Sequence, residues 1–309
     1  MNDALSLPIR AGRRVLIAGA SGTIGGALIP FLQTQGHDVV RLVRRSPSSV
    51  DEVFWNPGAG ELDIGALEGV DVIINLSGEN VAGGRWTEAR RDAIFRSRVD
   101  ATRTLVAAVR QVRRKPEVFV SASAVGFYGD RGEEILTERS RVGQGFLPEV
   151  CLAWETHAEG ARKVGVRTAL ARFGVVLTPR GGALAKLLPV FRMGLGGPVG
   201  GGAQWMSWIG IDDVIGGIYH LLNQPTCDGP MNFVAPVSVT NRQFTKTLAG
   251  VLHRPAVIPV PPVVLRGIFG EMANATLLAS TRVVPERLLA SGYQFKYSGL
   301  EAALRHVLG

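Results

Sequence analysis

The feature that most constrains this chain is a set of three glycines that follows a short apolar run. Residues 15–18 read Val-Leu-Ile-Ala, and Gly19, Gly22 and Gly25 follow at intervals of three. The apolar run favours a buried strand, and the apolar residues of 23–35 recur at the helical period. A strand, a glycine turn and a helix in this order predict a phosphate-binding turn of the kind that holds a dinucleotide.

Each glycine of this turn has a separate physical task. Gly19 permits the tight turn, Gly22 lets backbone amides approach a pyrophosphate, and Gly25 allows the helix to pack closely. The phosphates would lie at the positive end of the helix dipole. The residues predicted to bind the cofactor through this turn are Gly19, Ser21, Gly22, Thr23, Ile24 and Gly25.

The rest of the first half alternates apolar runs with helical patterns. We expect strands at 14–19, 38–43, 71–76, 117–122 and 167–173, and helices at 23–35, 88–110 and 149–163. This alternation predicts an α/β fold with a Rossmann-type doubly wound parallel sheet. We assign residues 12–175 to this domain, with contributions from about 203–235. The remainder, 176–309, is predicted to form a smaller interleaved C-terminal α/β substrate region, with 194–204 as a mobile lid.

The kind of dinucleotide is indicated by the residues that follow the second predicted strand. A protein that prefers NAD places an acid about 20 residues after the glycines, to hold the ribose 2′-hydroxyl. Here Arg44 and Arg45 occupy this place, and the first carboxylate is Asp51. Guanidinium groups suit the 2′-phosphate of NADP(H), and Arg44, nearest the strand, is the preferred ligand. The alternative is that one or both arginines are solvated surface residues.

Composition narrows the function classes further. The net charge is +8, but basic residues are spread along the chain among acids, which disfavours nucleic-acid binding. Two cysteines and five histidines show no metal-ligand spacing, so we expect no metal. There is no apolar run of membrane length, and residues 1–13 lack a signal-peptide pattern. We therefore expect a cytoplasmic protein that binds a small-molecule substrate, with a homodimer as one arrangement that its long helices allow.

Further motifs give a resemblance to the extended short-chain dehydrogenase/reductase superfamily of epimerases and dehydratases, over nearly the whole chain. Residues 71–78 resemble the strand whose end passes under the adenine ribose and phosphates, and 120–129 resemble the strand that carries the active-site serine. The run 204–209 and the C-terminal segment are similar to the YfcH-like branch of epimerase-family proteins, with its own C-terminal domain. The resemblance implies further cofactor contacts at Leu76, Ser77, Gly78, Arg98, Ser121, Arg172 and Gly174.

The sequence departs from this superfamily at its catalytic pair, a tyrosine four residues before a lysine. None of the four tyrosines has a lysine four residues on, and Leu147 and Cys151 stand where the pair belongs. The serine is predicted to survive as Ser123, with Ser121 as a second candidate. Candidates for a displaced acid or base are Tyr128, Cys151, Glu79 and Glu155. Ser123 and Tyr128 are the predicted catalytic residues.

Two functions remain in view. The first is an NADP(H)-dependent oxidoreductase or epimerase-like enzyme with a displaced proton donor, acting on a small polar substrate. The second is a non-catalytic NADP(H)-binding sensor or regulatory protein. The resemblance to an enzyme superfamily favours the first by analogy, and loss of the tyrosine and lysine favours the second.

Overall fold

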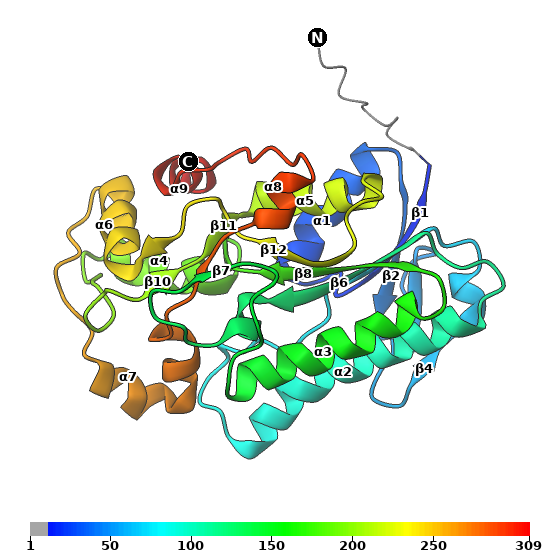
Figure 1. Cartoon of the computed structure of the whole chain (residues 1–309), viewed down its shortest axis with the longest axis horizontal. Coiled ribbons are helices and arrows are strands. Elements are labelled where there is room, and N and C mark those ends of the chain that lie inside the picture. The colour runs from blue at the N-terminus through cyan, green and yellow to red at the C-terminus, as the bar shows by residue number, and fades with distance from the viewer. Residues whose placement is uncertain (1–11) are drawn as a thin grey trace, which may run out of the picture.

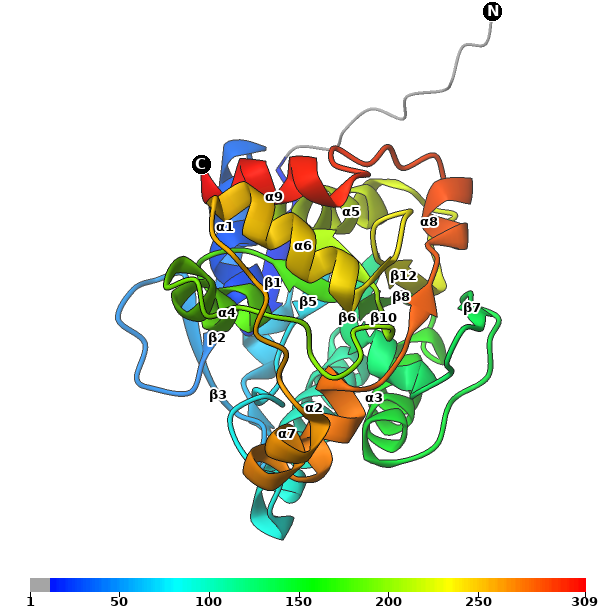
Figure 2. The same cartoon turned by 90° about the vertical axis from the view of Figure 1, so that its left-hand side faces the viewer.

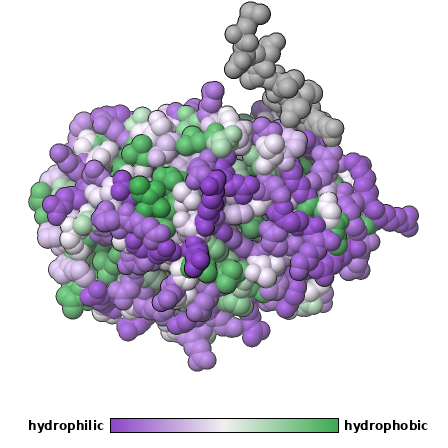
Figure 3. Space-filling model, viewed as in Figure 1, coloured by the Kyte–Doolittle hydropathy of each residue, from purple (hydrophilic) through white to green (hydrophobic). Residues whose placement is uncertain are grey.

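The structure, a computed structural model, describes residues 12–309. The expectation that the chain starts without a signal peptide concerns residues 1–13 and therefore lies mostly outside the described residues. Among the described residues, no helix is long and apolar enough to cross a membrane. The face shown in Figure 3 is mostly hydrophilic, and its hydrophobic residues form small separate groups.

The centre of the fold is an eight-stranded sheet with the order β12-β8-β6-β5-β1-β2-β3-β4. Its strands are β1 (Arg14–Ala18), β2 (Asp38–Val43), β3 (Glu52–Asn56), β4 (Glu61–Leu62), β5 (Val72–Asn75), β6 (Val118–Ala124), β8 (Arg167–Phe173) and β12 (Gly229–Phe233). All neighbours pair in parallel except β3 and β4. The order reverses between β1 and β5, as in other doubly wound sheets, and the predicted Rossmann-type fold is confirmed.

Helices cover both faces of the sheet, as Figure 1 shows. They are α1 (Thr23–Thr34), α2 (Glu88–Gln111), α3 (Phe146–Arg162) and α5 (Ile211–Asn223). Side chains alternate along β1: Val15 and Ile17 pack in the core cluster that includes α1 and α5, whereas Leu16 and Ala18 pack in the cluster that includes α2 and α3. Because both faces are covered, the central strands read as continuous apolar runs.

Three strands of the sheet, β3, β4 and β12, were not predicted. Strand β12 contains Gly229 and Pro230, which normally argue against a strand. The structure accommodates Pro230 because β12 is an edge strand that pairs only with β8. The return of 229–233 to the large sheet lies within the segment that the domain prediction assigned to it, and the boundary near 175 stays a prediction.

The C-terminal region packs beside the sheet around its own core. It contains α4 (Gly182–Arg192), α6 (Asn241–Leu252), α7 (Pro262–Phe269), α8 (Glu286–Ala290) and α9 (Leu300–Leu308). The remaining short elements of the fold are β7 (Ile135–Leu136), β9 (Val175–Leu177), β10 (Trp205–Met206), β11 (Trp208–Gly210), β13 (Val239–Thr240), β14 (Arg282–Val283), the 3-10 helices η1 (Ile64–Leu67) and η2 (Val125–Tyr128), and the π-helix η3 (Ala273–Leu277). Apolar side chains of α4, α6 and α9 meet over Leu177 and Trp208. Helix α7 lies beside the start of α2, where Arg91 and Glu271 pair at 2.8 Å (Figure 2).

The segment predicted as a lid, 194–204, is held by backbone hydrogen bonds. Gly196 and Pro198 accept hydrogen bonds from the amides of Ile258 and Val260, and Gly200 donates one to Val260. A Cβ at Gly197 would lie 1.7 Å from the carbonyl oxygen of Ile258, so the two segments are in direct contact there. A movement of 194–204 would therefore have to break these bonds or carry 255–262 with it.

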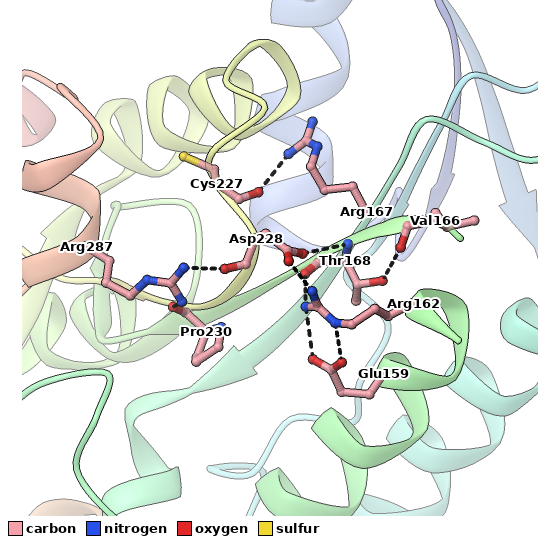
Figure 4. Close-up of polar contacts among 9 residues, drawn as sticks. All are labelled: Glu159, Arg162, Val166, Arg167, Thr168, Cys227, Asp228, Pro230 and Arg287. Atoms are coloured by element: carbon pink, nitrogen blue, oxygen red, sulfur yellow. Dashed lines mark hydrogen bonds and ion pairs between the residues drawn. The ribbon is translucent and has the colours of Figure 1, made fainter. Parts of the chain in front are cut away.

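A polar cluster fastens the C-terminal α8 to the large sheet at the starts of β8 and β12 (Figure 4). Asp228 accepts hydrogen bonds from the Thr168 amide and from Arg162 of α3. Arg287 of α8 donates to the carbonyl oxygens of Asp228 and Pro230. Because parallel strands place their starts at one edge, this cluster lies at the edge opposite the glycine turn, and its role is structural.

Candidate functional site

The three glycines of the turn are fixed by close backbone contacts. Gly19 has φ +84°, and a Cβ there would lie 2.7 Å from the Leu76 carbonyl carbon. A Cβ at Gly25 would lie 2.4 Å from the Gly19 carbonyl oxygen, so α1 could not approach the turn with a larger residue. Gly22 is less confined, with 3.2 Å between the same oxygen and its hypothetical Cβ. The need for glycine is therefore structural at Gly19 and Gly25, and Gly22 leaves space open on the solvent side.

The N-terminus of α1 is open to an anion. Gly22 is the N-cap residue, so no side chain caps the helix, and the first turn contains no acid. Ser21, Gly22 and Thr23 are exposed. The first amides of a helix have no partner within the helix and carry its positive dipole end. A phosphate at this point would satisfy both the amides and the dipole.

The two arginines after β2 differ in what they contact. Arg45 forms two hydrogen bonds to the Glu52 carboxylate, at 2.8 and 2.6 Å, and this arrangement lowers the pKa of Glu52 to about 2. Arg44 is exposed, and within residues 12–309 its guanidinium has no hydrogen bond or ion pair. The register of β1 on β2 pairs Ala18 with Leu42, so Arg44 follows β2 beside the start of the glycine turn. Of the two, Arg44 is free to bind a phosphate.

The end of β5 forms the floor beside the turn. The Leu76 amide donates to Ala18, at 2.8 Å, and the Ser77 amide donates to the Asn75 side chain, at 3.2 Å. The Glu79 amide donates to Ser97 Oγ of α2 at 2.9 Å. These bonds fix the path of Leu76, Ser77 and Gly78 along the edge of the sheet where the glycine turn lies.

Arg98 lies beneath this loop. Its guanidinium donates to the carbonyl oxygens of Ile94 and Glu79, both at 2.9 Å, and lies 5.1 Å from the centre of the Trp154 ring. A Cβ at Gly78 would come within 3.1 Å of the guanidinium carbon. In this position Arg98 supports the loop of residues 77–79, and its contact with the cofactor phosphates stays a prediction.

A hollow of about 480 Å³ opens beside the start of α1. Its walls come from α1, the loop after β9, α5 and α9, which are far apart in the sequence. The residues that line it include Ser21, Gly22, Thr23, Gly26, Ala27, Thr178, Pro179, Arg180, Ile211, Asp212, Ile215, His306 and Val307. The α1 side of this hollow was predicted from the sequence, whereas the loop of residues 178–181 was not. The adjacent Gly181 and Gly182, placed after a short apolar run, were the available signal.

Ser123 lies in the interior of the fold. Its Oγ donates a 2.6 Å hydrogen bond to Glu155 Oε1, and its exposed fraction is 2%. Glu155 in turn is paired with Arg172, through 2.7 Å and 2.8 Å contacts to Nη2 and Nε. Arg172 and Ser123 were predicted to lie near the bound ligand. In the structure both side chains bind Glu155, and their contacts with a ligand stay a prediction.

Tyr128 continues the same buried network. Its hydroxyl accepts from Arg172 Nη1 at 2.9 Å and donates to Asn232 Oδ1 at 2.7 Å. The side chain has no exposed surface, and burial raises the pKa of the phenol. The Arg172 guanidinium also lies 3.6 Å from the centre of the Phe127 ring. In this arrangement the Tyr128 hydroxyl has no access to a substrate, so we do not carry it forward as the proton donor.

Leu147 and Cys151 lie together on α3, next to Gly126. A Cβ at Gly126 would be 3.5 Å from Leu147 Cβ and 3.8 Å from Cys151 Sγ. Cys151 is 3% exposed, and burial raises the pKa of its thiol to about 12. A neutral buried thiol is a poor nucleophile and a poor acid, so Cys151 does not replace the lysine.

The last predicted contacts lie on β6 and after β8. Ser121 is buried and donates to the Ala122 carbonyl at 3.2 Å. Gly174 donates to Phe233, at 3.0 Å, and its hypothetical Cβ would lie 2.5 Å from the Ser207 carbonyl oxygen. Gly174 thus permits β8 to turn into β9 against the neighbouring backbone. Of the four displaced acids considered, Glu79 alone keeps a well-exposed side chain, at 40%, and it pairs with Arg90 at 2.9 Å.

Comparisons with known proteins cover almost the whole described chain. Residues 15–234 match the model of the NAD dependent epimerase/dehydratase family, and 260–307 match a domain of unknown function, DUF1731. An epimerase family protein of Mycobacterium bovis, Mb2239, is 40% identical over 94% of this chain and 96% of its own. The structure of human epimerase family protein SDR39U1 with NADPH is 34% identical, with a TM-score of 0.87 over 95% of this chain and 98% of that one. A nucleoside-diphosphate sugar epimerase from Corynebacterium glutamicum is 37% identical, with a TM-score of 0.81 over 97% of this chain and 59% of that one.

Proposed function

The chain belongs to the NAD dependent epimerase/dehydratase family, and from that premise we propose that it binds NADP(H) across the glycine turn and the end of β2. The observation that carries this proposal is the pairing of an uncapped α1 N-terminus with a free Arg44 on the adjacent strand end. The helix end would hold the pyrophosphate, and Arg44 would hold the 2′-phosphate. The human relative solved with NADPH supports the choice of cofactor.

Residues around this turn would form the rest of the cofactor site. Ser21, Thr23 and Ile24 would offer backbone or hydroxyl groups to the phosphates, and Leu76, Ser77 and Gly78 would lie along the adenine ribose and phosphates. When bound, the nicotinamide supplies hydride chemistry; the chain supplies orientation, charge and exclusion of water. Arg45 is excluded from this set because Glu52 already occupies both of its terminal nitrogens.

We propose an oxidoreductase or epimerase-like activity on a small polar substrate, in a reaction that does not use the tyrosine and lysine of the superfamily. The Corynebacterium glutamicum relative, described as a nucleoside-diphosphate sugar epimerase, makes sugar nucleotides the first substrates to test. Among the four acid or base candidates considered, Glu79 is the one that solvent reaches, and its carboxylate pairs with Arg90 at 2.9 Å.

A second function, a non-catalytic NADP(H) sensor, is favoured by one specific observation. Ser123, Tyr128 and Glu155 are all bound within a closed network of buried side chains, and Cys151 is buried beside it. A protein that had given up proton transfer could keep such a network for stability alone.

The two functions are separated by one experiment in two steps. Calorimetric titration of the purified protein with NADPH and with NADH measures both affinities. Nicotinamide absorbance is then followed on the NADPH complex during addition of carbonyl compounds and sugar nucleotides. Tight NADPH binding with oxidation on some substrate supports the enzyme, whereas tight binding without oxidation across the whole panel supports the sensor. Absence of NADPH binding overturns both.

A further inference from the structure

The loop of residues 178–181, between β9 and α4, packs directly on the start of α1. A Cβ at Gly181 would lie 2.3 Å from Thr23 Oγ1, so the backbone at Gly181 packs directly against the Thr23 side chain. Thr178 Oγ1 accepts a 3.3 Å hydrogen bond from the Arg180 amide, and Gly182 has φ +67°. Glycine at 181 and 182 thus lets the loop lie against the first residue of α1.

This packing places Arg180 at the hollow beside the start of α1. Arg180 lines the hollow together with Ser21, Gly22 and Thr23, whose backbone leads into the uncapped helix. Its side chain is exposed, and within residues 12–309 the guanidinium has no hydrogen bond or ion pair. An arginine held in a wall without a partner of its own has all five of its N–H donors available.

The other charged groups of the hollow already have partners. The carboxylate that lines the hollow is that of Asp212, and it lies 3.0 Å from His306 Nε2 and 3.7 Å from Lys296 Nζ. Asp212 is therefore engaged by these two side chains, and it forms no ion pair with Arg180. The guanidinium and the α1 dipole together make this part of the hollow attractive to an anion.

We propose that Arg180 is a second cationic contact of the bound dinucleotide, directed at its pyrophosphate. This inference rests on the proposed NADP(H) binding at the glycine turn, and it assigns Arg44 and Arg180 different tasks. Arg44 follows β2 and would bind the 2′-phosphate. Arg180 lies in the loop before α4 and would bind the pyrophosphate, which NADPH and NADH share.

The division of tasks is tested by measuring both affinities in matched variants. Arg180→Ala should weaken NADPH and NADH by a similar factor, about ten- to a hundredfold, because a charge-assisted hydrogen bond to the shared pyrophosphate is lost. Arg180→Lys, which keeps the charge without the planar fork, should give a smaller loss for both. Arg113→Ala removes another exposed arginine, at the opposite edge of the sheet, and should change neither affinity.

The outcomes separate this inference from the proposed function. If the unmodified protein binds neither cofactor, the proposed function itself fails. If it binds NADPH and Arg180→Ala binds both cofactors as tightly as Arg113→Ala does, the inference is wrong and the proposed function stands. A loss confined to NADPH would also overturn it, because Arg180 would then contact the 2′-phosphate. Thermal melting of each variant checks that the fold is kept.

Discussion

Glu155 Oε2 lies 2.7 Å from Arg172 Nη2, and the two side chains are only 9% and 4% exposed. The pair joins α3 to β8 and holds Ser123 on one side and Tyr128 on the other. In the superfamily that this chain resembles, the same part of the fold carries the proton-transfer residues. Here its polar groups satisfy one another, so the region works as a buried polar core.

Replacing Glu155 with glutamine should therefore act on stability. The variant leaves the Arg172 guanidinium buried without a counter-charge, a change that typically costs about 3–5 kcal/mol. Urea unfolding followed by fluorescence measures this loss. Glu149→Gln, an exposed acid on the same helix, is the control and should cost less than about 0.5 kcal/mol. Equal stabilities of the two variants would contradict the structural role.

The pH dependence of thiol reactivity follows from the surroundings of Cys151. Burial raises the pKa of this thiol to about 12 in the folded protein, whereas an unfolded cysteine titrates near 8.5. The folded state therefore keeps a proton that the unfolded state loses, and this group's contribution to stability falls as the pH rises from about 9 toward 12. At pH 8 to 9, iodoacetamide should label Cys151 at least tenfold more slowly in folded than in urea-unfolded protein, as measured by mass spectrometry.

The cofactor preference should depend on Arg44. Arg44→Asp replaces a free cation with an anion, so NADPH affinity should fall by about a hundredfold while NADH affinity changes less than about threefold. Calorimetric titration with both cofactors provides the measurement. Arg45→Ala is the matched control: Glu52 already holds this guanidinium, so the ratio of the two affinities should stay close to that of the unmodified protein. If Arg45→Ala changes the ratio of the two affinities and Arg44→Asp does not, the 2′-phosphate contact belongs to Arg45.

Gly22→Val should block the cofactor without unfolding the turn. The new Cβ lies 3.2 Å from the Gly19 carbonyl oxygen, a contact that small shifts relieve, but the two methyl groups fill the space in front of the α1 amides. NADPH affinity should fall more than about a hundredfold, with a melting temperature within a few degrees of the unmodified protein. Gly250→Ala, in α6 with nothing within 4 Å of its Cβ, should leave the affinity unchanged.

The sequence could predict those features of the fold that depend on residues close together in the chain. Local patterns predicted the five central strands and the glycine turn. The period of the apolar residues, the glycine spacing and the strand-to-helix order can each be recognised within about 20 residues. Strand β12 was missed because Pro230 and Gly229 are tolerated only at a sheet edge, which is a property of the topology. The loop with Arg180 was missed for a similar reason, since its neighbour Gly181 contacts Thr23 across more than half of the chain.

Ser123 is a single residue whose partner could not be predicted from the local sequence. Alternation along a strand puts Ser121 and Ser123 on one face, but it does not tell which neighbour covers that face. The partner of Ser123 is Glu155, 32 residues later on α3. A serine that meets a buried carboxylate is indistinguishable in sequence from one that meets a substrate.

The role of Ser123 can be decided by separating stability from turnover. The Glu155 oxygen that accepts from Ser123 also accepts from Arg172 Nε at 2.8 Å, so Ser123→Ala leaves Glu155 paired and should cost about 1–2 kcal/mol. NADPH affinity should remain within about twofold, and any turnover found in the substrate panel should persist. Tyr128→Phe should behave alike, since it removes one hydroxyl from the same network. If Ser123→Ala loses turnover while its stability and cofactor affinity stay unchanged, Ser123 acts in catalysis. A residue that acts only through packing cannot lower the rate without lowering stability or affinity as well.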